Sequence, residues 1–117
     1  MKYVYASRSG KTEKLVASLG LEGIKIEKGI EPIGEDFLLF TYTDGNGIVP
    51  PSVIRFLKNN SENLKGVVAT GSLERHADTF CFAADIISKE YNVPVLGKVN
   101  GAGDKDEVAK LKNDLGL

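Results

Sequence analysis

The sequence predicts a doubly wound α/β fold, a five-stranded parallel sheet with helices on both faces. Short apolar runs rich in Val, Ile, Phe and Tyr recur along the chain, and amphipathic helical patterns separate most of them. The runs lack polar alternation, which is typical of strands buried on both faces. Right-handed crossovers then leave few topologies, and the strand order 2-1-3-4-5 fits this element order best.

Each expected strand is an apolar run of ordinary strand length. The five runs are Lys2 to Ala6, Ile24 to Ile26, Phe37 to Tyr42, Gly66 to Ala69 and Val95 to Val99. The stretch KGIEPIGED, residues 28–36, carries Gly, Pro and charge and shows no helical period. We therefore expect an irregular connection between the second and third strands.

Four helices are expected between or after the strands, each from one apolar stripe. Gly20 is suited to ending the first helix, and Pro50 and Pro51 to opening the second. Asp78 and Asp104 are placed to cap the third and the fourth. The stripes are Leu15, Val16 and Leu19; Val53, Ile54 and Leu57; Phe80, Ala83, Ala84, Ile87 and Tyr91; and Val108, Leu111 and Leu115.

Length and composition indicate a single domain over residues 1–117. The formal net charge of −1 gives no attraction to nucleic acid or to an anionic membrane, and no apolar stretch could span a bilayer. The lone Cys81 excludes an internal disulfide and is expected to pack in the core. Because MKYVYASRSG lacks the apolar region of a signal peptide, we expect a cytoplasmic protein. From the net charge, we expect neither nucleic-acid nor membrane partners.

The turn ASRSGKT lies between the first strand and the first helix. Its ending imitates the P-loop, but Tyr5 stands where that motif has its first glycine, so the turn is too short to wrap a triphosphate. The hydroxyls of Ser7, Ser9 and Thr12 surround Gly10 at the start of a helix, where free N–H groups favour a phosphate monoester. Helix capping alone is the alternative explanation.

Two more polar loops are expected beside this turn. In open parallel sheets, ligands bind beyond the carboxyl ends of the strands, where the strand order reverses. TYTDGNGIVP, residues 41–50, follows the third strand, and ATGSLERHAD, residues 69–78, follows the fourth. Glycines let the backbone approach a ring edge, and Tyr42 offers an aromatic face. A phosphate seat beside such loops fits flavin mononucleotide (FMN).

TYTDGNGIVP, VIRFLKNN, KGVVATGS and ADIISKEYNVPVLGKV together resemble the NrdI family, flavodoxin-like FMN proteins that accompany class Ib ribonucleotide reductase. The resemblance runs from Tyr3 to Val108 and is strongest between Phe37 and Val99. It implies that reduced flavin reacts with O₂ to give superoxide, which helps generate the tyrosyl radical at the dimanganese site of the reductase small subunit. A separate, unidentified reductant must first reduce the flavin.

The resemblance also implies which residues hold FMN. The phosphate would be held by Ser7, Arg8, Ser9, Gly10, Lys11 and Thr12. The ring would be bordered on one side by Thr41, Tyr42, Thr43, Asp44, Gly45, Asn46 and Gly47, and on the other by Thr70, Gly71, Ser72, Leu73, Arg75 and His76. The third loop, GSLERHAD, is one residue longer than is usual in the family and carries Arg75 or His76 in place of an aromatic residue, so we expect an altered ring environment.

Several residues also have a plain structural interpretation. His76 is either a surface residue or, with Arg75, a cation that favours a negatively charged reduced ring. Asp44, Glu74 and Asp78 all suit turns or helix starts, so no metal site is assigned.

Two further functions stay open beside that of an accessory flavoprotein. A flavodoxin-type electron shuttle has the same fold, although such shuttles are commonly more acidic than this chain. A flavin-free interaction module is the third possibility, because a fold alone does not determine function.

Overall fold

The computed structural model describes residues 1–117 and contains a five-stranded sheet in the order β2-β1-β3-β4-β5. All four neighbouring pairs are parallel. The sheet order and direction confirm the sequence prediction, as do the positions of the five apolar runs. The strands are β1 (Lys2–Tyr5), β2 (Gly23–Lys25), β3 (Phe37–Tyr42), β4 (Leu64–Gly71) and β5 (Val95–Asn100).

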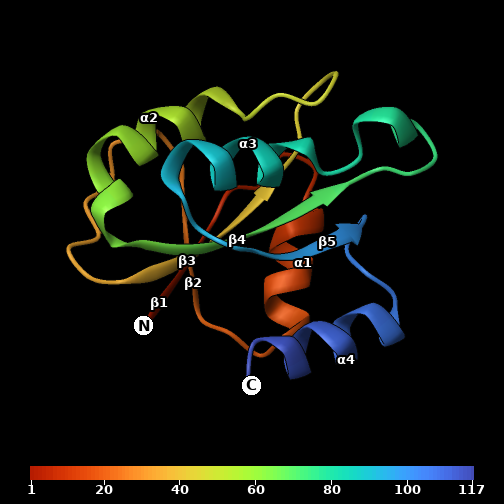
Figure 1. Cartoon of the computed structure of the whole chain (residues 1–117). Helices are drawn as coiled ribbons and strands as arrows, with labels where there is room; N and C mark the ends of the chain where they lie inside the picture. Colours follow the sequence, from red (N-terminus) through yellow and green to blue (C-terminus); the bar gives the residue numbers. More distant parts are fainter.

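Four α-helices cover the two faces of this sheet (Figure 1). They are α1 (Lys11–Ser18), α2 (Pro51–Asn60), α3 (Phe82–Tyr91) and α4 (Lys105–Asp114). In Figure 1, α2 and α3 lie above the sheet and α1 and α4 lie below it, which confirms the doubly wound arrangement. None of the helices is long and apolar enough to cross a membrane.

Two apolar cores hold the three layers together, one on each face of the sheet. Successive side chains of β3 enter opposite cores: Leu39 packs under α2 and α3, whereas Phe40 packs with Leu15 of α1. In the first core, the rings of Phe37 and Phe56 meet edge to face, with centroids 5.6 Å apart. Burial on both faces explains why the β3 sequence is apolar without alternation.

Three details of the predicted helices are wrong. Phe80, predicted in the apolar stripe of the third helix, lies outside α3, which begins at Phe82. Ile54 does not belong to the buried stripe of α2: its side chain is 44% exposed, and Phe56 is buried instead. Asp78 does not cap α3, because it lies in a separate 3-10 turn, Ala77–Thr79. The helix begins only after Cys81, which adopts a left-handed conformation with φ 55°. Packing of the buried Cys81 side chain against the sheet thus overrides the capping signal of Asp78.

The connection between β2 and β3 is irregular, as predicted, and begins with a turn closed by Glu31. The Glu31 carboxylate accepts hydrogen bonds from the backbone N–H groups of Glu27 at 2.8 Å, Lys28 at 3.0 Å and Gly29 at 2.9 Å. Burial acts to raise the pKa of Glu31, but the backbone hydrogen bonds outweigh it and lower the pKa from 4.5 to about 2. The turn is therefore held by a carboxylate that stays ionised.

Asn60, at the end of α2, fixes the rest of this connection. Its side chain is buried and donates to the carbonyl oxygens of Glu31 at 2.9 Å and Phe56 at 3.0 Å. Its amide oxygen accepts a hydrogen bond from the N–H of Ile33 at 3.1 Å. Residues 27–33, called the 27–33 connection below, are thus held by hydrogen bonds to the side chains of Glu31 and Asn60.

Candidate functional site

A cavity of about 470 Å³ opens at the carboxyl edge of the sheet, toward which the arrowheads of Figure 1 point. The strand order reverses between β1 and β3, so this edge is the place where a doubly wound fold binds its ligand. The cavity walls come from the loops that follow β1, β3, β4 and β5. Nearly all of the lining residues are polar, and the volume is typical of a small-molecule site.

The structure brings the three predicted loops together in one cavity. Each loop contributes at least four of the residues that the sequence singled out. The predicted residues that line the cavity are Arg8, Ser9, Lys11, Thr12, Tyr42, Thr43, Asp44, Gly45, Thr70, Gly71, Ser72, Arg75 and His76.

Six other predicted residues do not line the cavity, namely Ser7, Gly10, Thr41, Asn46, Gly47 and Leu73. Thr41 is fully buried within β3, where its hydroxyl donates to a backbone carbonyl at 2.9 Å. The Ser7 hydroxyl accepts a hydrogen bond from the N–H of Glu13 at 3.4 Å, so it acts as the helix-capping alternative expects. These positions shape the loops rather than face the cavity.

The first loop is joined to the third by a buried pair of hydroxyl groups. Thr12, in the first turn of α1, and Thr70, near the end of β4, are 1% and 3% exposed, and their oxygens lie 2.9 Å apart. Gly10 precedes the helix with φ 86°, a conformation that favours glycine, and no side chain caps the helix from that position. The helix start is therefore held rigidly while Ser9 and Lys11 face the cavity.

The second loop places a buried hydroxyl without a protein partner beside the cavity. The side-chain oxygen of Thr43 is inaccessible to solvent and makes no hydrogen bond within the protein. The backbone N–H of Thr43 donates to the carbonyl of Thr70 at 3.1 Å, which fixes the backbone of the second loop to β4. Leaving a buried polar atom unpaired costs stability, and such atoms are rare in folded proteins. Thr43 therefore brings to the cavity wall a hydroxyl that no protein group pairs.

Tyr42, just before Thr43, gives the cavity its aromatic face. Burial and the negative charge of Asp44 raise the pKa of Tyr42, and the nearby Arg8 partly opposes them. The Arg8 guanidinium lies over the Tyr42 ring, 5.2 Å from the centroid, and forms an ion pair with Asp44. The resemblance implies that Arg8 holds a phosphate, and in this structure Arg8 bridges the first and second loops.

The third loop is attached to the end of β5. The carbonyl of Gly71 accepts a hydrogen bond from the N–H of Gly101 at 2.8 Å, and the Asn100 side chain accepts one from the N–H of Leu73 at 3.1 Å. Gly101 lines the cavity and was not among the predicted site residues. The sequence could have indicated Gly101, because its loop also follows a strand that ends at the same edge of the sheet. Glu74 likewise lines the cavity.

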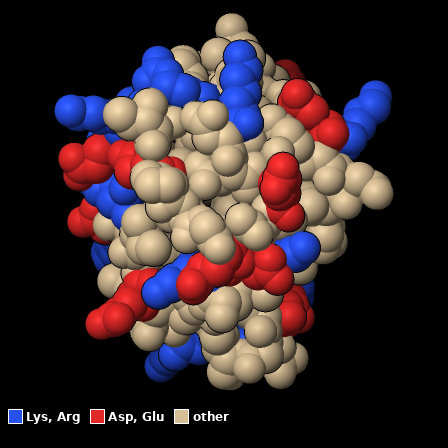
Figure 2. Space-filling view, turned by 90° about the vertical axis from the view of Figure 1, so that its left-hand side faces the viewer, with Lys and Arg blue, Asp and Glu red and all other residues tan.

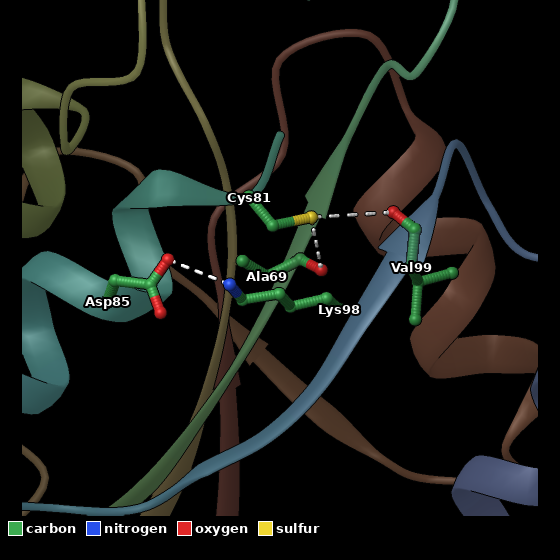
Figure 3. Close-up of polar contacts among 5 residues, drawn as sticks. All are labelled: Ala69, Cys81, Asp85, Lys98 and Val99. Atoms are coloured by element: carbon green, nitrogen blue, oxygen red, sulfur yellow. Dashed lines mark hydrogen bonds and ion pairs between the residues drawn. The ribbon is translucent and has the colours of Figure 1, made fainter. Parts of the chain in front are cut away.

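Cys81 does not line the cavity. Its side chain points toward Ala69 and Val99 of the sheet (Figure 3). Its side chain is fully buried, with Sγ 3.4 Å from the carbonyl oxygen of Ala69 and 3.8 Å from that of Val99. Burial raises the pKa of this thiol to about 11. The neighbouring Lys98 and Asp85 form an ion pair at 2.8 Å. The structure therefore confirms that Cys81 is a packing residue.

Charged side chains of both signs reach the cavity. Arg8, Lys11 and Arg75 are positive, and Asp44 and Glu74 are negative. No three His, Cys, Asp or Glu side chains come together as a metal-binding group would. The arrangement can hold an anion at the first loop and a flat polar ring between the second and third loops, which fits a phosphorylated ring compound.

Comparison with known proteins identifies the family. Residues 3–113 match the family model described as NrdI Flavodoxin like. Over 121 residues, the chain is 41% identical to Protein NrdI of Ruegeria sp. (strain TM1040), covering 95% of this chain and 84% of that protein. The chain belongs to the NrdI family. This confirms the resemblance carried by the stretches from TYTDGNGIVP to ADIISKEYNVPVLGKV.

Solved flavodoxins share the fold of this NrdI-family chain. Oxidised flavodoxin 2 of Bacillus cereus matches it with a TM-score of 0.68 at 24% identity, over 97% of this chain and 94% of that one. A Fusobacterium nucleatum flavodoxin bound to FMN matches with a TM-score of 0.63 at 16% identity, over 99% of this chain and 98% of that one. At these identities the likeness shows the flavodoxin-like fold.

Proposed function

We propose that this chain binds FMN in the cavity and supplies superoxide for assembling the dimanganese-tyrosyl radical cofactor of a class Ib ribonucleotide reductase small subunit. The observation that carries FMN binding is the unpaired Thr43 hydroxyl in a polar cavity at the switch point of the sheet. Membership of the NrdI family supports the rest, because the resemblance implies this partner and this chemistry. The remaining partners are O₂ and an unidentified reductant, and the proposed compartment is the cytoplasm.

The first loop supplies the groups that would hold the phosphate. Lys11 and Ser9 line the cavity beside the start of α1, where backbone N–H groups lack helical partners. Lys11 makes no ion pair within the protein, so its charge is available to a phosphate. A dianionic phosphate would gain charge-assisted hydrogen bonds there.

The second and third loops supply the groups that would hold the ring. Thr43 would hydrogen-bond a polar ring edge, and Tyr42 would present its face to the ring plane. Gly71 and Ser72 form the opposite wall, which is fixed to the end of β5. When bound and reduced, FMN supplies the electrons that convert O₂ to superoxide. The protein contributes binding and orientation, while the cofactor carries the chemistry.

FMN titration tests the cofactor, with flavin fluorescence as the measurement. We expect saturable binding to the wild-type protein and about fivefold weaker binding to Lys11→Ala, the loss of one exposed charge contact with phosphate. Lys14→Ala is the matched control, because Lys14 lies on the same helix but outside the cavity. A protein that binds no FMN would instead be the flavin-free interaction module.

Radical formation tests the proposed partner. The reduced protein, O₂ and a manganese-loaded class Ib small subunit are mixed, and the tyrosyl radical is measured by EPR. We expect a radical signal above that of a control without this protein. A signal no larger than the control would favour the electron shuttle. Surface charge does not decide between these two functions. On the face drawn in Figure 2, Lys and Arg side chains mix with Asp and Glu side chains.

A further inference from the structure

Arg8 extends from the first loop across the cavity and covers the ring of Tyr42 in the second. Its guanidinium carbon lies 5.2 Å from the Tyr42 ring centroid. Its Nη1 donates a hydrogen bond to Oδ1 of Asp44 at 2.5 Å, across 36 positions of sequence. All three residues line the cavity. The face on which a flat ring would stack is therefore already in contact with a cation.

Within this ion pair, Asp44 is the fixed partner. Its backbone exchanges two hydrogen bonds with Ile48, at 2.9 Å and 3.0 Å, which close the turn of the second loop. The Asp44 side chain is 24% exposed, whereas the Arg8 side chain is 64% exposed. A long, exposed side chain loses its partner more easily than a short one on a closed turn. We therefore expect Arg8, rather than Asp44, to change position when the ion pair separates.

A phosphate at the first loop would compete with Asp44 for Arg8. Arg8 belongs to the same loop as Ser9 and Lys11, and a guanidinium pairs with phosphate oxygens as readily as with a carboxylate. Once Arg8 turns to a phosphate, the face of Tyr42 is free for a ring. A ring without a phosphate must break the Arg8–Asp44 ion pair without that compensation.

We propose that Arg8 is a specificity-determining residue: the Arg8–Asp44 ion pair opposes ring binding, and a phosphate monoester relieves it. The site thereby favours FMN over riboflavin by more than the direct phosphate contacts provide. The inference rests on the proposed binding of FMN in this cavity. Coupling between two binding events is reciprocal, so phosphate and ring must each promote binding of the other.

Riboflavin carries the ring of FMN without its phosphate group, and inorganic phosphate can occupy the phosphate site alone. Titrating one in the presence of the other therefore measures this coupling. Riboflavin is titrated by fluorescence in phosphate and in chloride buffer of equal ionic strength, because salt alone also weakens an exposed ion pair. We expect phosphate to lower the riboflavin Kd about three- to tenfold in the wild-type protein, the range for an exposed ion pair plus a cation–π contact.

The variant Asp44→Asn removes the ion pair and keeps the shape of the side chain. We expect it to bind riboflavin more tightly than the wild type in chloride and to show no further gain in phosphate. The matched control is Asp85→Asn, which breaks the Lys98–Asp85 pair outside the cavity and should behave as the wild type. In Arg8→Ala, the ratio of the riboflavin Kd to the FMN Kd should fall.

An absent phosphate effect in the wild type, or an equal effect in Asp44→Asn, overturns the inference. If riboflavin binding is too weak to measure, FMN decides: Asp44→Asn must bind FMN more tightly than the wild type, and an equal or weaker affinity overturns the inference. Failure of the wild type to bind FMN would defeat the proposed function and this inference with it. FMN binding without the coupling would defeat this inference alone.

Discussion

Two irregular parts of this chain use polar side chains in opposite ways. In the 27–33 connection, the Glu31 carboxylate and the Asn60 amide find all their partners in the protein. In the loop after β3, the buried Thr43 hydroxyl finds none. An unpaired buried polar group lowers stability, so the first region is arranged for stability. In the second region, we expect the hydroxyl to bond a ligand.

The largest expected effect is a loss of stability in the 27–33 connection. Asn60→Ala leaves the N–H of Ile33 and the carbonyl of Glu31 without their partners, so we expect a loss of about 2–3 kcal/mol in the free energy of unfolding. Denaturant unfolding measures it, and FMN affinity should not change. The control is Asn59→Ala, an exposed neighbour expected to cost less than about 0.5 kcal/mol. Equal losses in both variants would refute the structural role of Asn60.

The second expected effect is on FMN affinity rather than on stability. Thr43→Val removes an unpaired hydroxyl, so stability should stay the same or rise, whereas FMN affinity should fall about fivefold, the value of one net hydrogen bond. Thr41→Val is the matched comparison: it loses a paired hydroxyl and should cost about 1 kcal/mol of stability without weakening FMN binding. Calorimetry and flavin titration measure the two quantities. Equal changes in stability and in FMN affinity in the two variants would contradict the contrast between an unpaired and a paired hydroxyl.

The smallest effect concerns pH and Glu31. Since the folded pKa, about 2, lies below the reference value of 4.5, the carboxylate stabilises the fold above pH 4.5 and loses this contribution as the pH falls toward 2. We expect Glu31→Gln to lose about 1 kcal/mol or less at neutral pH, allowing for solvent screening, and to depend less on pH in that window. Glu22→Gln, at an exposed position, should retain the wild-type profile.

The fold was predictable because periodic burial leaves a mark on the sequence. The β3 run from Phe37 to Tyr42 is apolar throughout because both faces of the strand are buried, and its predicted bounds are confirmed. Three of the loops that line the cavity were predictable as well, because loops after parallel strands meet at one edge of the sheet. That these loops hold FMN stays a prediction.

Long-range pairings and local competition were not predictable in the same way. Nothing in the neighbourhood of Arg8 indicates its ion pair with Asp44, because that contact depends on two loops brought together by folding. Asp78 carries a capping signal, but the burial of Cys81 sets the helix start. Ile54 and Phe56 are both apolar, so the sequence does not indicate which of the two is buried. Packing decides in favour of Phe56.

The burial of Cys81 also bears on how a protein that generates superoxide would resist oxidation. Oxidants attack the thiolate, and a thiol whose pKa is about 11 provides very little of it at neutral pH. The other sulfur of the chain is that of Met1, which is 66% exposed and belongs to neither apolar core. A chain that releases superoxide from the proposed site would therefore hold no vulnerable sulfur in the parts that maintain its shape.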